Sequence, residues 1–182
     1  MTDTRVVVLV GSLRADSLNR RIAEHLRAEA PAGVVVEIAE NLAELPFYNE
    51  DLDNGTDVPA AAVALREQVA AADRVLAVTP EYNGTMPAVL NNAIDWLSRP
   101  YGQGAIVGKP FAAIGATPTP YGGKWSHEHA RHSATIAGAV VVEGIVVDEP
   151  ALEGDPLANE AAVQRFLGAL DALVAHEVEV AA

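Results

Sequence analysis

Cysteine is absent from this chain of 182 residues. Disulfides, thiolate redox chemistry and cysteine-based zinc or iron–sulfur sites are therefore excluded, and any electron transfer would need an organic cofactor. Aromatic residues make up only 5% of the chain, and no apolar run approaches the length that spans a bilayer. The segment Met1 to Arg5 leads straight into a strand-like run with no signal-peptide pattern, so we expect a cytoplasmic protein without membrane contact.

Basic residues are also scarce. The chain has 12 Lys and Arg against 25 Asp and Glu, which gives a net charge of −13. Such a charge repels nucleic acids and anionic membranes, so we expect neither as a partner. A polyanionic nucleotide must then be met by local positive charge, which Arg14, Arg20 and Arg21 can supply near the first loop described below. The chain has no internal repeat and no low-complexity linker, and we expect residues 1–182 to form one domain.

Strand-like and helix-like patterns alternate along the chain, which predicts a three-layer α/β fold around a parallel sheet. Strands are expected near 5–10, 34–39, 74–79, 111–116 and 139–148, and helices near 19–30, 58–72, 87–98, 123–137 and 156–176. Asp155 is the expected cap of the last helix, and Pro156 its first residue. Residues 40–59 form the only long irregular stretch, which we expect to border the active site.

The loop Gly11 to Ser17 joins a buried-type strand to a helix N-terminus, where exposed N–H groups and the helix dipole favour a phosphate. Its polar side chains suit that ligand: Ser12, Arg14, Ser17 and, just beyond, Asn19. With a single glycine and no following Lys, the loop is unlike nucleoside triphosphate and dinucleotide motifs, which leaves a monophosphate. The alternative is an ordinary turn in which Ser17 or Asn19 only caps the helix.

A second polar loop, Pro80 to Thr85, follows another buried-type strand and precedes a helix opened by Pro87. In open α/β sheets, ligands bind at the carboxyl edge of the strands, where the strand order reverses. The two loops together therefore predict a phosphate loop and a ring-binding loop on one sheet, as a flavin nucleotide requires.

These motifs resemble a known family. Gly-Ser-Leu-Arg-x-x-Ser-x-Asn-Arg at 11–20 and Pro-Glu-Tyr-Asn-Gly-x-x-Pro-x-x-Leu-x-Asn-Ala-Ile-Asp-Trp at 80–96 are similar to the NADPH-dependent FMN reductase family, which includes flavodoxin-like quinone, azo and chromate reductases. The stretches 45–52 and 108–123 are similar too, so the resemblance runs from Val6 to about Gly144.

The resemblance implies a flavodoxin-like fold, with a five-stranded parallel sheet in the order 2-1-3-4-5 and helices on both faces. It implies that the FMN phosphate is held by Ser12, Arg14, Ser17 and Asn19. The ring and ribityl chain would be lined by Pro80, Glu81, Tyr82, Asn83 and Gly84, and the far side of the ring by Thr117, Gly122 and Gly123. One departure stands out: the family's Ser-Pro-Gly is Thr117-Pro118-Thr119 here, followed by Pro120, which stiffens that loop.

The family's activity implies an oxidoreductase that passes hydride from NADPH or NADH, through the flavin N5, to a small-molecule acceptor such as a quinone, free flavin, azo compound or chromate. The cofactor carries the chemistry, so no catalytic acid or base is expected. The resemblance also implies a homodimer or homotetramer. Two alternatives stay open: a flavodoxin-type electron carrier, favoured by the acidity of the chain, and a scaffold without flavin, suggested by Thr119 and Pro120.

Three histidines, His127, His129 and His132, invite a metal interpretation. Helical geometry places His127 and His129 about 200° apart, so the three do not converge, and we expect no metal but a solvated helix face or a subunit contact. Trp96 is expected in the core or at a dimer surface rather than against a flavin.

Overall fold

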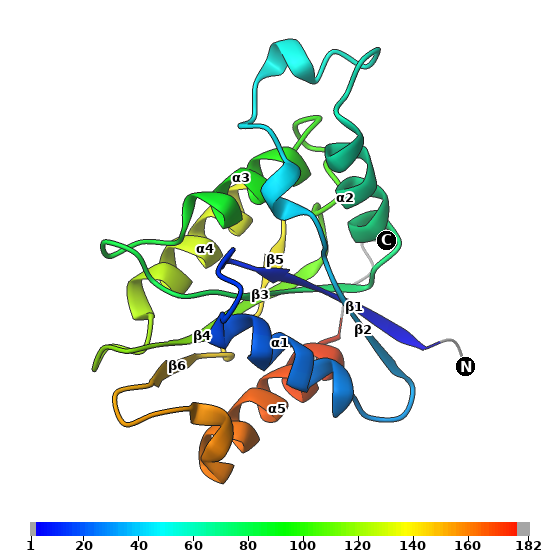
Figure 1. Cartoon of the computed structure of the whole chain (residues 1–182). Helices are drawn as coiled ribbons and strands as arrows, with labels where there is room; N and C mark the ends of the chain where they lie inside the picture. Colours follow the sequence, from blue (N-terminus) through cyan, green and yellow to red (C-terminus); the bar gives the residue numbers. More distant parts are fainter. Residues whose placement is uncertain (1–2, 178–182) are drawn as a thin grey trace.

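A computed structural model describes residues 3–177 of the chain (Figure 1). The strands are β1 Thr4–Val10, β2 Val34–Ile38, β3 Arg74–Val78, β4 Pro110–Thr117, β5 Val140–Val141 and β6 Val147–Pro150. The α-helices are α1 Leu18–Ala28, α2 Ala60–Ala70, α3 Ala88–Leu97, α4 Lys124–Ile136 and α5 Glu160–Ala175. Short 3₁₀ helices occupy Leu42–Glu44, Glu50–Leu52 and Pro156–Ala158.

The strands form one parallel sheet in the order β2-β1-β3-β4-β5, and β6 also pairs with β4. β1 is central: Val8 is in register with Ile38 of β2 on one side and with Leu76 of β3 on the other. This is the 2-1-3-4-5 order of the flavodoxin-like fold, and the predicted fold class is confirmed.

The single fifth strand expected at 139–148 is wrong in one respect. β5 pairs with the start of β4, where Val141 faces Phe111, and β6 pairs with its end, where Val147 faces Ile114. The stretch between β5 and β6 therefore holds three residues more than the matching stretch of β4. The surplus residues leave the strand pairing and form a turn at Glu143 and Gly144, closed by a bond from the Ile145 N–H to the Val142 carbonyl.

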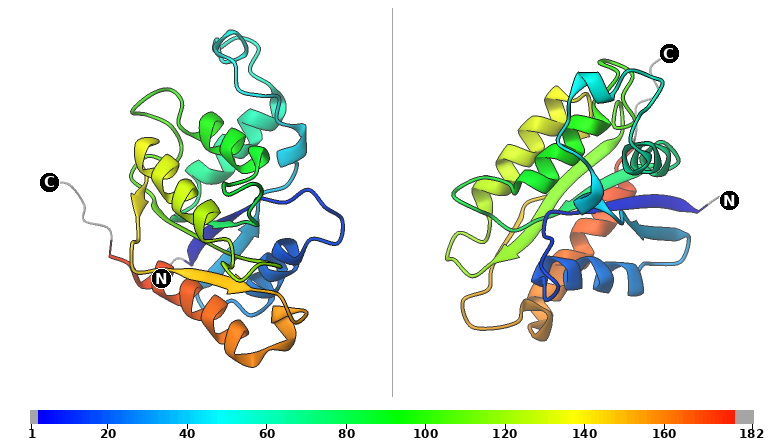
Figure 2. Two further views of the ribbon diagram at one scale, coloured as in Figure 1. Left: turned by 90° about the vertical axis from the view of Figure 1, so that its left-hand side faces the viewer. Right: turned by 45° about the horizontal axis from the view of Figure 1, so that its top comes forward.

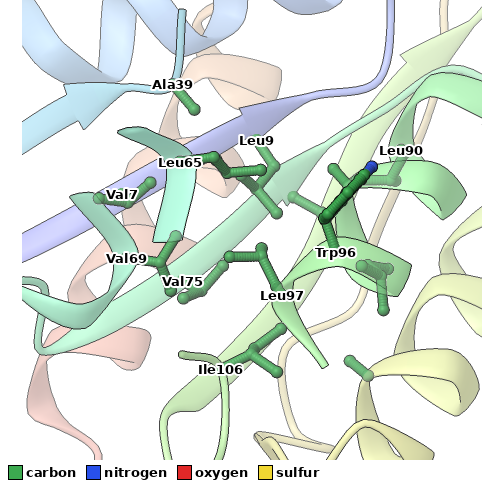
Figure 3. Close-up of a cluster of buried hydrophobic side chains, with 14 of the residues drawn as sticks. Val7, Leu9, Ala39, Leu65, Val69, Val75, Leu90, Trp96, Leu97 and Ile106 are labelled. Atoms are coloured by element: carbon green, nitrogen blue, oxygen red, sulfur yellow. The ribbon is translucent and has the colours of Figure 1, made fainter. Parts of the chain in front are cut away.

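Two hydrophobic cores lie on the two faces of the sheet. Successive residues of β1 point to opposite faces, so Val7 and Leu9 pack with α2, α3 and α4, while Val6 and Val8 pack with α1 and α5. Figure 2 shows α1 and α5 together on one side of the sheet. Figure 3 shows the other core, where side chains of α2 and α3 gather over β1 and β3: Leu65, Val69, Trp96 and Leu97 over Val7, Leu9 and Val75.

Trp96 is fully buried in this core, which was one of its two predicted placements, and its indole N–H donates to the Pro46 carbonyl at 2.8 Å.

The last α-helix begins later than predicted. Asp155 caps the 3₁₀ turn, accepting from the Leu157 N–H, and Asn159 caps α5 itself. Both residues are good caps, and the extended backbone of Asn159 separates the two helices. No helix within residues 3–177 is long and apolar enough to cross a membrane.

Candidate functional site

A cavity of about 510 Å³ opens at the carboxyl ends of β1, β3 and β4, where the strand order reverses. Four segments form its walls: the β1–α1 loop with the first turns of α1, the loop after β3, the loop after β4, and residues 151–155. The predicted site residues that line it are Ser12, Arg14, Ser17, Asn19, Pro80, Glu81, Tyr82 and Thr117. Asn83, Gly84, Gly122 and Gly123 lie outside the lining, in the turns that shape it.

The first wall ends in the N-terminus of α1. Ser17 is the cap, and its hydroxyl accepts a hydrogen bond from the Arg20 N–H at 3.1 Å. Within residues 3–177 the hydroxyl proton of Ser17 has no acceptor, so a hydroxyl that already caps the helix still has a hydrogen to donate into the cavity. The capping interpretation and the phosphate interpretation of Ser17 are thus compatible.

Arg14 differs from the two arginines that follow it. Arg20 binds Glu40 at 2.9 Å, and Arg21 pairs with Asp155. Among the residues that the structure describes, Arg14 is exposed and forms no ion pair. Of these three arginines, Arg14 is the one whose positive charge remains free at the cavity, beside the positive end of the α1 dipole.

Asn19 is buried and is bonded across the sheet. Its side-chain oxygen accepts from the Ala116 N–H at 3.0 Å, and its amide nitrogen donates to the Ala116 carbonyl at 2.9 Å. The side chain therefore completes the backbone bonding of β4 as another strand would. One amide hydrogen remains for a ligand.

The second wall is a small hairpin. Tyr82 and Thr85 exchange backbone hydrogen bonds at 3.0 and 3.1 Å, and Asn83 and Gly84 between them have φ of 53° and 73°. Positive φ at both central residues is typical of a type I′ turn, for which Asn-Gly is the preferred pair. The conformation at Gly84, rather than lack of space, explains the glycine, because a Cβ there would meet no atom within 4 Å.

Glu81 has a structural partner that the sequence did not indicate. Its carboxylate accepts from the N–H groups of Trp125 and Ser126, at 3.1 and 3.3 Å, and so caps α4 from a distant loop. Gly123, the residue at the cap position of α4, has no side chain to do this. A negative charge at a helix N-terminus is stabilising, so the hairpin and α4 hold each other in place.

The third wall is the loop after β4. The hydroxyls of Thr117 and Thr119 lie 2.9 Å apart and share a hydrogen bond. Asn41 and Asn83 are the non-glycine residues with positive φ among residues 3–177, so Thr119 holds an ordinary backbone conformation without the family's glycine. Gly122 packs against the backbone of Asp148, and Gly123 against the ring of His127.

The fourth wall, residues 151–155, was missed by the sequence analysis. Ala151, Gly154 and Asp155 line the cavity, and the Ala151 N–H donates to the Thr117 carbonyl at 2.8 Å. No motif marked this segment, because the sequence Gly-Asp-Pro is equally typical of a helix start.

The side chains of His127, His129 and His132 lie in three different surroundings. His127 is fully buried, which makes the expectation of a solvated face wrong for that residue. The exposed His129 meets the hydroxyl of Thr85 at 2.8 Å, and His132 lines a separate cavity between the ends of α3 and α4. The described part of the chain contains no group of three His, Asp or Glu side chains arranged to hold a metal ion.

Part of the irregular stretch 40–59 lies beside the β1–α1 loop. Residues 41–44 line a second cavity, of about 320 Å³, which shares Ser12 and Arg14 with the first. Further along, Asp53 is held by both terminal nitrogens of Arg66 at 2.7 Å. Hydrogen bonds from that guanidinium lower the pKa of the Asp53 carboxyl despite its burial. The stretch is thereby fixed to α2.

Comparison with known proteins agrees with this geometry. Residues 4–151 match the family described as NADPH-dependent FMN reductase. A 2-hydroxy-1,4-benzoquinone reductase from a Burkholderia species is 43% identical over 127 residues, which cover 70% of this chain and 68% of that protein. A quinone reductase from Escherichia coli K12 is 36% identical over 156 residues, which cover 86% of this chain and 80% of the other.

A solved structure is also similar. FerB, a flavoenzyme NAD(P)H:(acceptor) oxidoreductase from Paracoccus denitrificans, superposes with a TM-score of 0.78 at 32% identity, over 94% of this chain and 95% of that one. The family match covers β1 to β6 and three of the four segments that form the cavity, and it ends at Ala151, where the fourth segment begins. The chain therefore belongs to the NADPH-dependent FMN reductase family.

Proposed function

We propose that residues 1–182 act as one domain that binds FMN in the 510 Å³ cavity and catalyses electron transfer from NADPH or NADH to a small-molecule acceptor. One observation carries this proposal. A single cavity brings together the N-terminus of α1, the cation of Arg14, which forms no ion pair within residues 3–177, and two loops at the ends of β3 and β4. The volume lies within the usual range of about 300–1,000 Å³ for cofactor cavities.

The phosphate end of FMN would be held by the N-terminus of α1. Arg14 supplies a fork of N–H donors and a full charge, which suits a phosphate dianion. Ser12 and Ser17 add hydroxyls, and Asn19 adds its one remaining amide hydrogen. These donors lie in the loop before α1 and in its first turn, and all four residues line the same cavity, so a single phosphate group could meet them together.

The ring end would lie between the Pro80–Tyr82 segment and the loop Thr117–Thr119. Tyr82 is 46% exposed, so its ring is available to cover a flat ligand. The hairpin 82–85 and the loop 117–123 hold these walls by backbone bonds and tight turns rather than by flexible side chains. Asn83, Gly84, Gly122 and Gly123 would therefore act through the shape of the walls.

Bound FMN would supply the chemistry, accepting hydride from the nicotinamide and passing electrons to a quinone, free flavin, azo compound or chromate. Relatives named as quinone reductases favour a quinone as the acceptor. The protein's part is to orient the ring, to keep water from one of its faces and to neutralise the phosphate. We further propose a cytoplasmic homodimer or homotetramer, which size-exclusion chromatography with light scattering tests.

The net charge of −13 favours a second candidate, an electron carrier that docks onto basic partner proteins. One experiment separates the two. The visible absorption of FMN-reconstituted protein is recorded anaerobically before and after addition of NADPH, and again with NADH. Rapid bleaching of the bound flavin band supports the reductase. A bound band that stays unbleached with both nucleotides supports the carrier, and failure to bind FMN refutes both.

A further inference from the structure

Three consecutive residues of the ring wall bond to three consecutive residues in the first turn of α4. The Glu81 carboxylate accepts from the Trp125 and Ser126 N–H groups, and the Ser126 hydroxyl donates to the Pro80 carbonyl at 2.8 Å. The third contact joins the His127 Nε2 to the Thr79 carbonyl at 3.0 Å. The first two contacts are ordinary capping and hydroxyl bonds. The third uses a titratable side chain with no exposed surface.

His127 has a partner on each ring nitrogen. Its Nδ1 lies 2.6 Å from a carboxylate oxygen of Asp148, which sits on β6 beside Gly115 of β4. A carbonyl oxygen only accepts, so Nε2 must carry a hydrogen. A separation of 2.6 Å between Nδ1 and an oxygen also requires a hydrogen between them, because two facing lone pairs would repel. Each ring nitrogen thus bonds to a different part of the sheet, Nε2 to the residue after β3 and Nδ1 to β6.

The backbone around the ring leaves room for it. A Cβ on Gly123 would lie 3.0 Å from both Cε1 and Nε2 of His127, and a Cβ on Gly115 would lie 2.2 Å from the Thr79 carbonyl oxygen to which Nε2 bonds, 2.7 Å from the Asn19 Oδ1 and 3.0 Å from Nε2 itself. Glycine at both positions lets the imidazole sit between α4, β3 and β4. Burying a polar imidazole costs free energy unless its nitrogens are hydrogen-bonded, so the two hydrogen bonds of His127 offset the cost of placing it here.

The two partners of His127 lead into different walls of the cavity. Thr79 is the residue from which the Pro80–Tyr82 wall begins, and Asp148 lies three residues before Ala151, where the 151–155 wall begins. One imidazole thus links the ends of β3 and β6 through α4. A shift of either wall would have to stretch one of its two bonds.

We propose that His127 and Asp148 form a latch that positions the ring walls of the FMN cavity, with His127 donating hydrogen bonds to Thr79 and Asp148, the residues that lead into the two walls. The latch rests on the proposed function for its ligand, but its hydrogen bonds exist without FMN. His127 is a positioning residue, since it has no exposed surface and does not line the cavity.

The test compares changes at Asp148 with a matched change at Glu149, its neighbour on β6, which pairs with Arg165 of α5 instead. Asp148→Ala removes the acceptor of Nδ1, whereas Asp148→Asn keeps a partner, because an amide can donate to the Nδ1 of a neutral ring while Nε2–H still binds Thr79. Glu149→Ala removes the same charge from the same strand without touching the latch.

Three readouts apply: the FMN dissociation constant by fluorescence titration, amide hydrogen exchange of residues 81–85 in the FMN-free protein, and the ¹⁵N spectrum of the His127 ring. We expect a hydrogen on both ring nitrogens of the unaltered protein. We expect Asp148→Ala to raise the FMN dissociation constant about tenfold, because FMN would bind only the fraction of molecules in which the cavity walls are ordered. The same change should speed amide hydrogen exchange at residues 81–85. Asp148→Asn and Glu149→Ala should stay within about threefold of the unaltered protein, since neither leaves Nδ1 without a partner.

Equal effects of Asp148→Ala and Glu149→Ala would overturn the latch. So would a hydrogen on only one ring nitrogen in the unaltered protein, a result that remains available if Asp148→Ala does not fold. Failure of the unaltered protein to bind FMN would instead refute the proposed function, and the exchange and ¹⁵N measurements would still decide the latch.

Discussion

Arg14→Ala should weaken FMN binding while leaving riboflavin binding unchanged. The two ligands share ring and ribityl chain and differ in the phosphate, which is the group that Arg14 would contact. A hydrogen bond to a charged group contributes about 1.5–3 kcal/mol when desolvated, and the exposure of Arg14 places its contribution near the low end. A loss of about 1.5 kcal/mol is about a tenfold rise in the FMN dissociation constant.

Titration of each ligand by flavin fluorescence, with Arg27→Ala as the control, measures this difference. Arg27 is exposed in the last turn of the same helix, so its removal changes the net charge equally without altering the cavity. The expected result is a tenfold effect on FMN and less than a twofold effect on riboflavin for Arg14→Ala, and neither for Arg27→Ala. Equal weakening of FMN and riboflavin would remove Arg14 from the phosphate site.

Three further changes test other parts of the structure. Gly84→Val places a β-branched residue at φ 73°, at a cost of about 1–3 kcal/mol, so FMN binding should be lost while the circular dichroism spectrum stays native; retained affinity would contradict the hairpin's role. Asn19→Ala leaves the Ala116 N–H and carbonyl unpaired, so urea unfolding without FMN should show a loss of about 1–3 kcal/mol for each group, and an unchanged unfolding free energy would make Asn19 a ligand only. Asp53→Asn should destabilise the protein by about 1–3 kcal/mol at pH 7. Folding lowers the pKa of the Asp53 carboxyl, so the ionised carboxylate stabilises the fold above the pKa of the unfolded chain, and this stabilisation is lost as pH falls through the pKa of the folded protein. The unfolding free energies of the unaltered protein and of Asp53→Asn should therefore converge in acid. A difference that does not depend on pH would contradict the Arg66 contact.

The sequence was sufficient to predict the features that depend on neighbouring residues. The strand order followed from the family resemblance, whereas buried strands followed by polar loops identified the parallel sheet and the two loops at its carboxyl edge. The latter inferences need only local patterns and the general rule that ligands bind at the carboxyl edge of a parallel sheet. The helix boundaries agree with prediction to within two residues for α1 to α4.

The features that the sequence could not provide depend on distant pairs. From the sequence alone, Asn19 could bind a phosphate or bond to the backbone of a strand, and only its contact with Ala116, 97 positions away, shows the second role. Glu81 and His127 acquire their partners from α4, β3 and β6, which no local pattern brings together. The apolar run after Ala139 gave no sign of the surplus residues between β5 and β6, because valines on both sides suit one continuous strand.

The pairing of Arg20 and Arg21 with carboxylates has a kinetic consequence. With those charges neutralised, Arg14 and the N-terminus of α1 are what attract an approaching dianion to the cavity among residues 3–177, while the net charge of −13 repels it from a distance. Salt at physiological strength screens interactions beyond about 8 Å but leaves a contact pair largely intact. Added salt should therefore speed the entry of FMN and NADPH, the opposite of the slowing seen where a broad positive surface steers an anion to its site.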